Sequence, residues 1–144
     1  MNLVKLYDLD PKFVVLTVSR LARDRNVIEF LKAARDLKDH ANIRFMVCGG
    51  GSLENYLRSL TKKWGCTNVI FTGEIPNPLI PQYLSIADIF VNPLNDAGIC
   101  RNVLEAMACG KPVLRKVIED DDPLLEDGVN FIKRHARARG TVRQ

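Results

Sequence analysis

The sequence predicts a single α/β domain in which helices cover both faces of a parallel β-sheet, the doubly wound arrangement. Three observations favour this fold. Short apolar runs, typical of strands covered on both faces, alternate with longer segments of helical periodicity. The connections between these segments are short, which is typical of right-handed crossovers in parallel sheets. The length of 144 residues suits one compact domain.

Five strands are expected, and each is a short apolar run. The runs lie at residues 13–18, 43–48, 69–72, 89–92 and from 112 to 114. The first run, FVVLTV, is apolar almost throughout and rich in β-branched residues. Such a composition is typical of a central strand, because helices cover both of its faces.

Four helices are expected between and after these strands, over residues 27–37, 53–64, 81–86 and 102–109. At the start of the first, Asn26 and Glu29 have the spacing of a capping box. Ser52 is placed to cap the second helix, and Gly110 is placed to end the fourth.

The domain is expected to cover residues 13–132, after a linker at 1–12 and before a basic, disordered tail at 133–144. Much of the net charge of +4 falls near that tail, on Lys133, Arg134, Arg137, Arg139 and Arg143. The remaining sequence shows no basic face of the kind that binds nucleic acid, so no nucleic-acid partner is expected.

The cysteines indicate neither disulfides nor a metal site. Cys48, Cys66, Cys100 and Cys109 form no C-x-x-C pair and lack the spacing of metal ligands. Cys48 and Cys109 lie in apolar segments and are predicted to be small buried residues. A reducing, cytoplasmic location is therefore expected. The sequence has no run of transmembrane length and no signal-peptide pattern.

The loops that follow residues 18, 48, 72 and 92 are the expected place for a ligand, since ligands of doubly wound sheets bind beyond the carboxyl ends of the strands. The first loop contains Ser19, Arg20 and Arg25 close to a helix start, and arginine suits phosphate oxygens. The second is the glycine triplet at 49–51, which allows close approach of a ligand or another backbone. Taken alone, a solvated arginine cluster and a structural turn explain these loops better.

The helix after the fourth loop contains Glu105 among apolar neighbours. Gly98 lies just ahead of this helix, where unpaired N–H groups could hold an anion. A buried carboxylate needs hydrogen-bonding partners. Sugar hydroxyls would serve, and so would backbone amides or a nearby arginine. The residues alone leave a ligand contact and a structural ion pair equally open.

Four segments, in order along the chain, form a recognisable pattern. They are VSRLARDRN, MVCGGGS, VIFTGEIP followed by YLSIADIFVNP, and GICRNVLEAMACGKPV. Together they resemble the signature of retaining glycosyltransferases of family 4, in the GT-B class, whose donor-binding half has a Rossmann-like fold. The matching family motifs are G-R-L-x-x-x-K-G, V-x-G-x-G-P, V-x-F-x-G-x-V with Y-x-x-A-D-x-x-V-x-P, and A-M-A-x-G-K-P-V. The resemblance runs from about residue 13 to residue 114.

The resemblance implies roles for residues of the first three loops. Arg20 matches the arginine that binds the pyrophosphate of the donor. Arg25 stands where the family has a phosphate-binding lysine, so the two arginines would stabilise the departing diphosphate. Gly49 and Gly51 match glycines beside the nucleotide, and Ile75 matches the residue whose backbone holds the nucleobase.

The fourth loop carries the remaining implied roles. The amides of Gly98, Ile99 and Cys100 match those that meet the distal phosphate and the sugar. Glu105 matches the second family glutamate, which binds the ribose hydroxyls. Ala97 stands in place of the first family glutamate, which contacts the donor sugar, so this contact is absent.

The implied function is donor binding in a retaining glycosyltransferase that transfers a hexose to a glycan, lipid or small-molecule acceptor. The donor would be a UDP-, GDP- or ADP-sugar, with no metal and no cofactor. The acceptor-binding half is expected from another domain or subunit, so this domain alone is not expected to be active. Peripheral membrane association through that partner and self-association are both left open.

Two other interpretations remain. Ala97 and the missing acceptor domain favour a non-catalytic nucleotide-sugar-binding or regulatory module derived from a glycosyltransferase. An unrelated doubly wound protein, such as a receiver domain, would need an acidic cluster after the first strand. Ser19 and Arg20 stand there instead, which disfavours a receiver.

Overall fold

The computed structural model describes residues 2–93, 100–117 and 132–135. Its sheet has six strands, all parallel, in the order β3-β2-β1-β4-β5-β6. The strands are β1 (Phe13–Val18), β2 (Ile43–Cys48), β3 (Val69–Gly73), β4 (Ile89–Asn92), β5 (Val113–Val117) and β6 (Ile132–His135). This order confirms the doubly wound fold, and the first five strands lie where the sequence predicts them.

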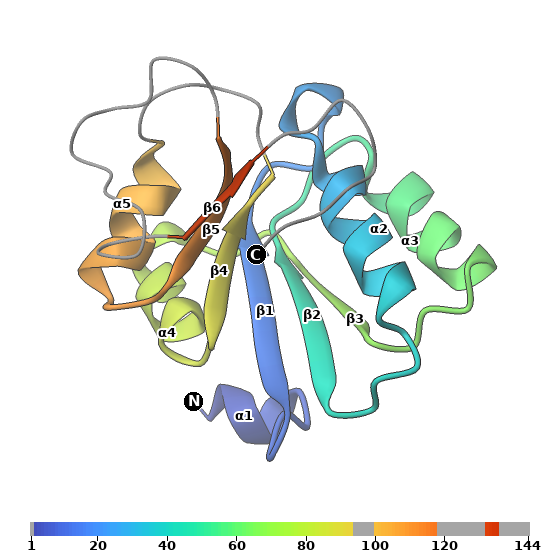
Figure 1. Ribbon diagram of the computed structural model, residues 1–144, viewed down its shortest axis with the longest axis horizontal. Helices are drawn as coiled ribbons and strands as arrows, with labels where there is room; N and C mark the ends of the chain where they lie inside the picture. Colours follow the sequence, from blue (N-terminus) through green and yellow to red (C-terminus); the bar gives the residue numbers. More distant parts are fainter. Residues whose placement is uncertain (1, 94–99, 118–131, 136–144) are drawn as a thin grey trace.

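Helices cover both faces of this sheet (Figure 1). On one face lie α2 (Val27–Asp36) and α3 (Glu54–Lys63), and on the other lie α4 (Ile80–Ser85) and α5 (Arg101–Ala108). Two short 3-10 helices, η1 (Arg23–Arg25) and η2 (Asn77–Leu79), precede α2 and α4. Each helix connects consecutive parallel strands, as crossover connections require. Within the described residues, none of the helices is long and apolar enough to span a membrane.

The central strands alternate their side chains between two hydrophobic clusters. Met46 and Cys48 of β2 pack in the cluster under α4 and α5, whereas Phe45 and Val47 pack in the cluster under α2 and α3. Leu16 of β1 is fully buried in the first cluster. Because successive side chains of a strand point to opposite faces, a continuous apolar run serves both clusters at once.

Two predicted helix caps are wrong. Asn26 has a left-handed backbone (φ 56°) and caps nothing, because its side-chain Nδ2 donates to the carbonyl oxygen of Pro93 at 2.9 Å. Ser52 lies in a turn, and α3 begins after Leu53 without a side-chain cap. The end of α5 is as predicted, since Gly110 has a φ of 72° and its N–H donates to Met107.

The segment at 1–12 differs from the expected linker. Leu3–Leu6 forms the short helix α1, which lies beyond the ends of the strands where they begin (Figure 1). Leu3 and Leu9 are buried in the cluster under α4 and α5. The hydroxyl groups of Tyr7 and Tyr83 lie 3.3 Å apart and join this segment to α4. Burial of these leucines accounts for the difference, because the apolar surface of α4 accepts them.

The strand β6 was not predicted, and it includes residues 133–135 of the expected tail. It pairs with β5, with Leu114 opposite Ile132 and Val117 opposite His135. Its sequence, IKRH, lacks the apolar run that marks a buried strand, and a polar strand at a sheet edge is common. The rest of the expected tail, 136–144, lies outside the described residues.

Asp88 closes the hydrogen-bonding ladder where β1 and β4 begin. Its carboxylate Oδ2 accepts from the N–H of Val14 at 2.7 Å, and its own N–H donates to the carbonyl of Val14 at 2.9 Å. The register pairs Val15 with Ile89, so Asp88 supplies an acceptor to the one amide just beyond the ladder. The acid of the Y-x-x-A-D segment therefore has a structural task at the end of the sheet away from the predicted ligand.

We predict that Asp88→Ala lowers the free energy of unfolding by about 1–2 kcal/mol, because the partly buried amide of Val14 loses its charged acceptor. Urea denaturation measures this change. Asp39→Ala is the control, since Asp39 is exposed and its side chain makes no hydrogen bond or ion pair within the described residues. Equal stability of the two variants would show that the Asp88 contact contributes nothing.

Candidate functional site

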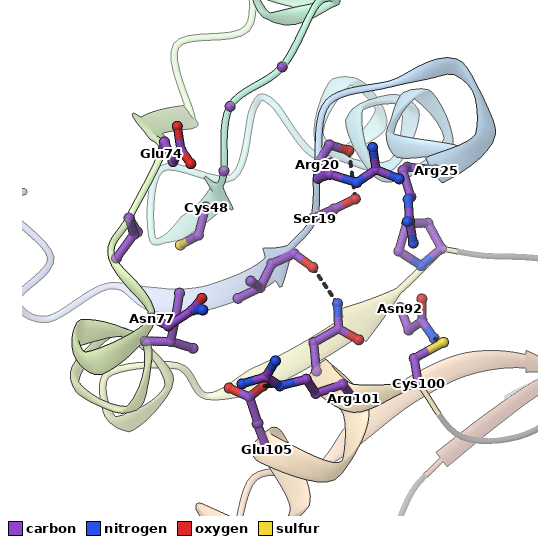
Figure 2. Close-up of a pocket in the computed structure, with 18 residues that line it drawn as sticks. Ser19, Arg20, Arg25, Cys48, Glu74, Asn77, Asn92, Cys100, Arg101 and Glu105 are labelled. Carbon is purple, nitrogen blue, oxygen red and sulfur yellow. Dashed lines mark hydrogen bonds and ion pairs between the residues drawn. The ribbon is translucent and has the colours of Figure 1, made fainter.

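A cavity of about 630 Å³ opens at the carboxyl ends of β1, β2, β3 and β4 (Figure 2). It lies at the switch point of the strand order, where β1 and β4 are neighbours although β2 and β3 come between them in the chain. Every predicted site residue that the structure describes lines this one cavity: Arg20, Arg25, Gly49, Gly51, Ile75, Cys100 and Glu105. Ala97, Gly98 and Ile99 lie outside the described residues.

The loop after β1 and the glycine triplet after β2 are joined by backbone hydrogen bonds. The N–H of Ser19 donates to Cys48, and the N–H of Leu21 donates to Gly50, both at 2.9 Å. The carbonyl of Leu21 accepts from Leu53 at 2.9 Å, just before α3 begins. These bonds place Arg20 at the cavity between two fixed backbone positions.

Only glycine fits this contact at positions 49 and 51. Gly49 and Gly51 have φ values of 143° and 155°. A Cβ atom at Gly49 would overlap the carbonyl oxygen of Ser19, and one at Gly51 would lie 2.6 Å from the carbonyl oxygen of Leu21. The sequence left open whether these glycines allow a ligand or another backbone to approach closely. The structure shows that the neighbour is the backbone of the loop after β1.

The two predicted arginines reach the cavity from the same loop and have only weak partners. The guanidinium of Arg20 is 66% exposed and lies 4.0 Å from Asp24 Oδ2. Arg25 is 34% exposed, with its Nε 3.8 Å from Asp24 Oδ1. The Nε atom of Arg25 is buried and makes no hydrogen bond within the described residues. A buried donor of this kind needs a partner, and an anion in the cavity would supply one.

The first turn of α5 forms another wall. Asn102 donates through Nδ2 to the carbonyl of Val18, which ties this turn to the end of β1. Cys100 is the N-cap residue, and its Sγ accepts from Asn92 Nδ2 at 3.7 Å. The first turn of α5 therefore lines the cavity together with Ser19 and Arg20.

Glu105 lies at the cavity wall with a partner of its own. Its Oε1 is 3.2 Å from Nε of Arg101, one turn earlier on α5, and its side chain is 35% exposed (Figure 2). The acid is thus not the buried carboxylate that its apolar neighbours suggested. Both sequence alternatives are present in part, because Glu105 forms an ion pair and also faces the cavity.

Cys48 gives the cavity an uncharged lining at the end of β2. It is fully buried, as predicted, and burial raises the pKa of its thiol to about 12, so the thiol stays protonated at neutral pH. Ile75 and Ile80 add apolar surface nearby. Cys109 is only partly buried against the core, so the prediction that it is buried is wrong.

Several lining residues were not predicted as site residues. They are Glu74, Asn77, Arg101 and Asn102, among others. These four lie within two residues of a predicted position, but sequence position does not show which side chains turn toward the cavity. Among the described residues, no group of three or more His, Cys, Asp or Glu side chains could hold a metal ion.

Comparison with known proteins supplies a family. The family model described as glycosyl transferases group 1 matches residues 5–130. The chain is 27% identical over 128 residues to the alpha-D-kanosaminyltransferase of Streptomyces kanamyceticus. The matched segment covers 88% of this chain and 33% of that protein. It thus spans about a third of the length of the curated relatives it matches.

Two solved structures share the fold. HepE from Anabaena, solved in complex with UDP, has a TM-score of 0.77 at 24% identity, over 91% of this chain and 37% of that chain. The C-terminal domain of the group 1 glycosyl transferase LpcC from Francisella tularensis has a TM-score of 0.72 at 23% identity. That match covers 88% of this chain and 70% of the LpcC domain.

We predict that Gly49→Ala destabilises the domain more than Gly110→Ala does. Gly110 also has a positive φ, so Gly110→Ala should cost about 1–2 kcal/mol of backbone strain. A Cβ at this position meets nothing within 4 Å, so no collision is added. Gly49→Ala adds a collision with the backbone of Ser19, which should cost about 1–3 kcal/mol more. Urea unfolding of both variants measures the difference, and equal losses would contradict the close contact.

Proposed function

The chain belongs to the group 1 glycosyl transferases, and on that premise we propose that its cavity binds the nucleoside diphosphate of a sugar donor. The enzyme would be a retaining member of family 4 in the GT-B class, and this chain would be its donor-binding half. One observation carries the proposal: Arg20, Arg25 and Glu105 line a single cavity at the switch point of the sheet.

The proposed roles follow the chemistry of the cavity wall. Arg20 and Arg25 bind the diphosphate, and the partners they now have are distant enough for phosphate oxygens to replace. Glu105 accepts hydrogen bonds from the ribose hydroxyls, and the backbone at Ile75 holds the nucleobase. Gly49 and Gly51 keep the loop backbone close, so no side chain there competes with the nucleotide.

The fourth loop would complete the donor site. The amides of Gly98, Ile99 and Cys100 meet the distal phosphate and the sugar, next to the first turn of α5. The partial positive charge of a helix start favours a phosphate at that position. UDP is the first ligand to test, since the structurally similar HepE was solved with it. GDP and ADP are the alternatives.

The chemical contribution of this half would be stabilisation of the leaving group. When the bond from the sugar to the diphosphate breaks, negative charge builds up on the phosphate oxygens. Arginines held in place before the reaction stabilise that charge without reorganisation. Neither a metal nor a cofactor has a part in this proposal.

The acceptor would be bound by another domain or subunit, and a hexose would pass to a glycan, a lipid or a small molecule. The curated relatives are about three times as long as the matched segment, which leaves room for such a domain in them. We therefore do not expect transfer by this domain alone. The protein would be cytoplasmic, and contact with a membrane would come through the partner.

A second candidate function rests on Ala97. The family glutamate that contacts the donor sugar is absent there, so the domain could bind a nucleotide sugar without supporting transfer. Such a protein would be a binding or regulatory module derived from a glycosyltransferase. Its diphosphate site would be the same, so nucleotide binding does not distinguish the two candidates.

We predict that UDP, GDP or ADP binds the chain and that Arg20→Ala weakens this binding ten- to a hundred-fold. The lost charge-assisted hydrogen bonds are worth about 1.5–3 kcal/mol. Isothermal titration calorimetry measures the affinity. Arg23→Ala is the matched control, because Arg23 lies in the same loop and is exposed but does not line this cavity. No binding of any of the three nucleotides would overturn the proposed function.

We predict that Ala97→Glu raises transferase activity when a family acceptor domain is supplied in trans, if the chain is half of an enzyme. The restored carboxylate would contact the donor sugar near the reacting carbon. Release of the nucleoside diphosphate measures turnover, and Ala97→Gln tests whether charge is required. No transfer by either variant, with nucleotide binding intact, would favour the non-catalytic module.

A further inference from the structure

Arg101 is a charged residue of the cavity wall that has no role in the proposal above. It is the first residue of α5 and lines the cavity, and its side chain is 81% exposed. Its Nε lies 3.2 Å from Oε1 of Glu105. Arg101 therefore forms an ion pair with the carboxylate of Glu105, which could otherwise accept hydrogen bonds from a ligand.

Helix stability does not explain this ion pair. An exposed pair at i and i+4 contributes little, because water screens the charges and two long side chains lose freedom. Its order is also the less favourable one, with the arginine on the N-terminal side of the glutamate. A cation in the first turn is further repelled by the partial positive charge of the helix start.

The position of Arg101 in the cavity favours contact with a bound anion. The first turn of α5 is held at the end of β1 by the hydrogen bond from Asn102 to Val18, so Arg101 extends from a fixed base. Arg20 and Arg25 come from the loop after β1, whereas Arg101 comes from α5 (Figure 2). Cations from two separate elements can contact different oxygens of one diphosphate.

The charges of the described lining residues lead to the same conclusion. The acidic residues are Glu74 and Glu105, and they would balance Arg20 and Arg25. Arg101 therefore gives the described lining residues one more positive than negative charge, and Asp24, the neighbour of Arg20 and Arg25, does not line the cavity. An excess of positive charge is what a site for a doubly charged anion requires.

We propose that Arg101 is a third diphosphate-binding arginine that Glu105 holds while no nucleotide is present. When a nucleotide binds, the ribose hydroxyls donate hydrogen bonds to the carboxylate of Glu105, and the guanidinium of Arg101 moves to contact a phosphate oxygen. The two charged groups exchange partners, so neither is left unpaired. This inference rests on the proposed function, and it adds a residue that selects phosphorylated ligands over nucleosides.

The test compares UDP and uridine by calorimetry on the unaltered chain and on Arg101→Ala. We expect the affinity for UDP to fall about tenfold, as for loss of one charge-assisted contact. The affinity for uridine should stay equal or rise, because Glu105 is then free to accept from the ribose. Arg101→Lys should recover part of the UDP affinity, since lysine keeps the charge but not the planar fork.

Lys32→Ala is the matched control, because it removes one positive charge and one exposed helical ion pair on α2, outside the cavity. Its affinity for UDP should equal that of the unaltered chain. Equal UDP affinity of Arg101→Ala and the unaltered chain would overturn this inference alone. A parallel loss for UDP and uridine would also overturn it, since that outcome indicates damage to α5. Failure of the unaltered chain to bind UDP, GDP or ADP would overturn the proposed function, and this inference with it.

Discussion

The backbone contact between the loop after β1 and the glycine triplet after β2 is the constraint on which the site depends. The carbonyls of Ser19 and Leu21 lie so close to the triplet that no Cβ fits at Gly49 or Gly51. Hydrogen bonds from Leu21 to Gly50 and from Leu53 to Leu21 join the ends of two strands and the start of α3. The position of Arg20 is thus decided by backbone geometry, and its side chain remains free to meet a ligand.

The residues of the family signature divide between the scaffold and the cavity. Lys111 of the G-K-P-V segment donates through Nζ to the carbonyl of Ser85 at 2.9 Å, and so satisfies the end of α4. Asp88 completes the ladder between β1 and β4, and Tyr83 joins α4 to the N-terminal segment. Such residues maintain the fold whether or not the domain catalyses transfer. The signature therefore indicates the architecture and the family, and it does not by itself indicate activity.

The three arginines of the cavity share one property, which is that their present ion pairs are weak. Arg20 and Arg25 both lie near the exposed carboxylate of Asp24, at 4.0 and 3.8 Å, and Arg101 lies near Glu105. Water screens such pairs, so a bound anion can displace them at small cost. The thiol of Cys48, which also lines the cavity, stays protonated and adds no competing charge.

The sequence by itself determined the parallel strands, the helices on both faces and the loops where a ligand would bind. These follow from apolar periodicity and from the alternation of strands and helices, which are patterns along the chain. Only the tertiary structure decided which groups meet. Asn26 donates to Pro93 instead of capping α2, Glu105 is held by Arg101, and the polar strand β6 finds its place beside β5. Asn26 and β6 find their partners in distant parts of the chain, so no spacing along the sequence reveals them. Arg101 and Glu105 have the i, i+4 spacing of a helical ion pair, but only the tertiary structure shows that both line the cavity.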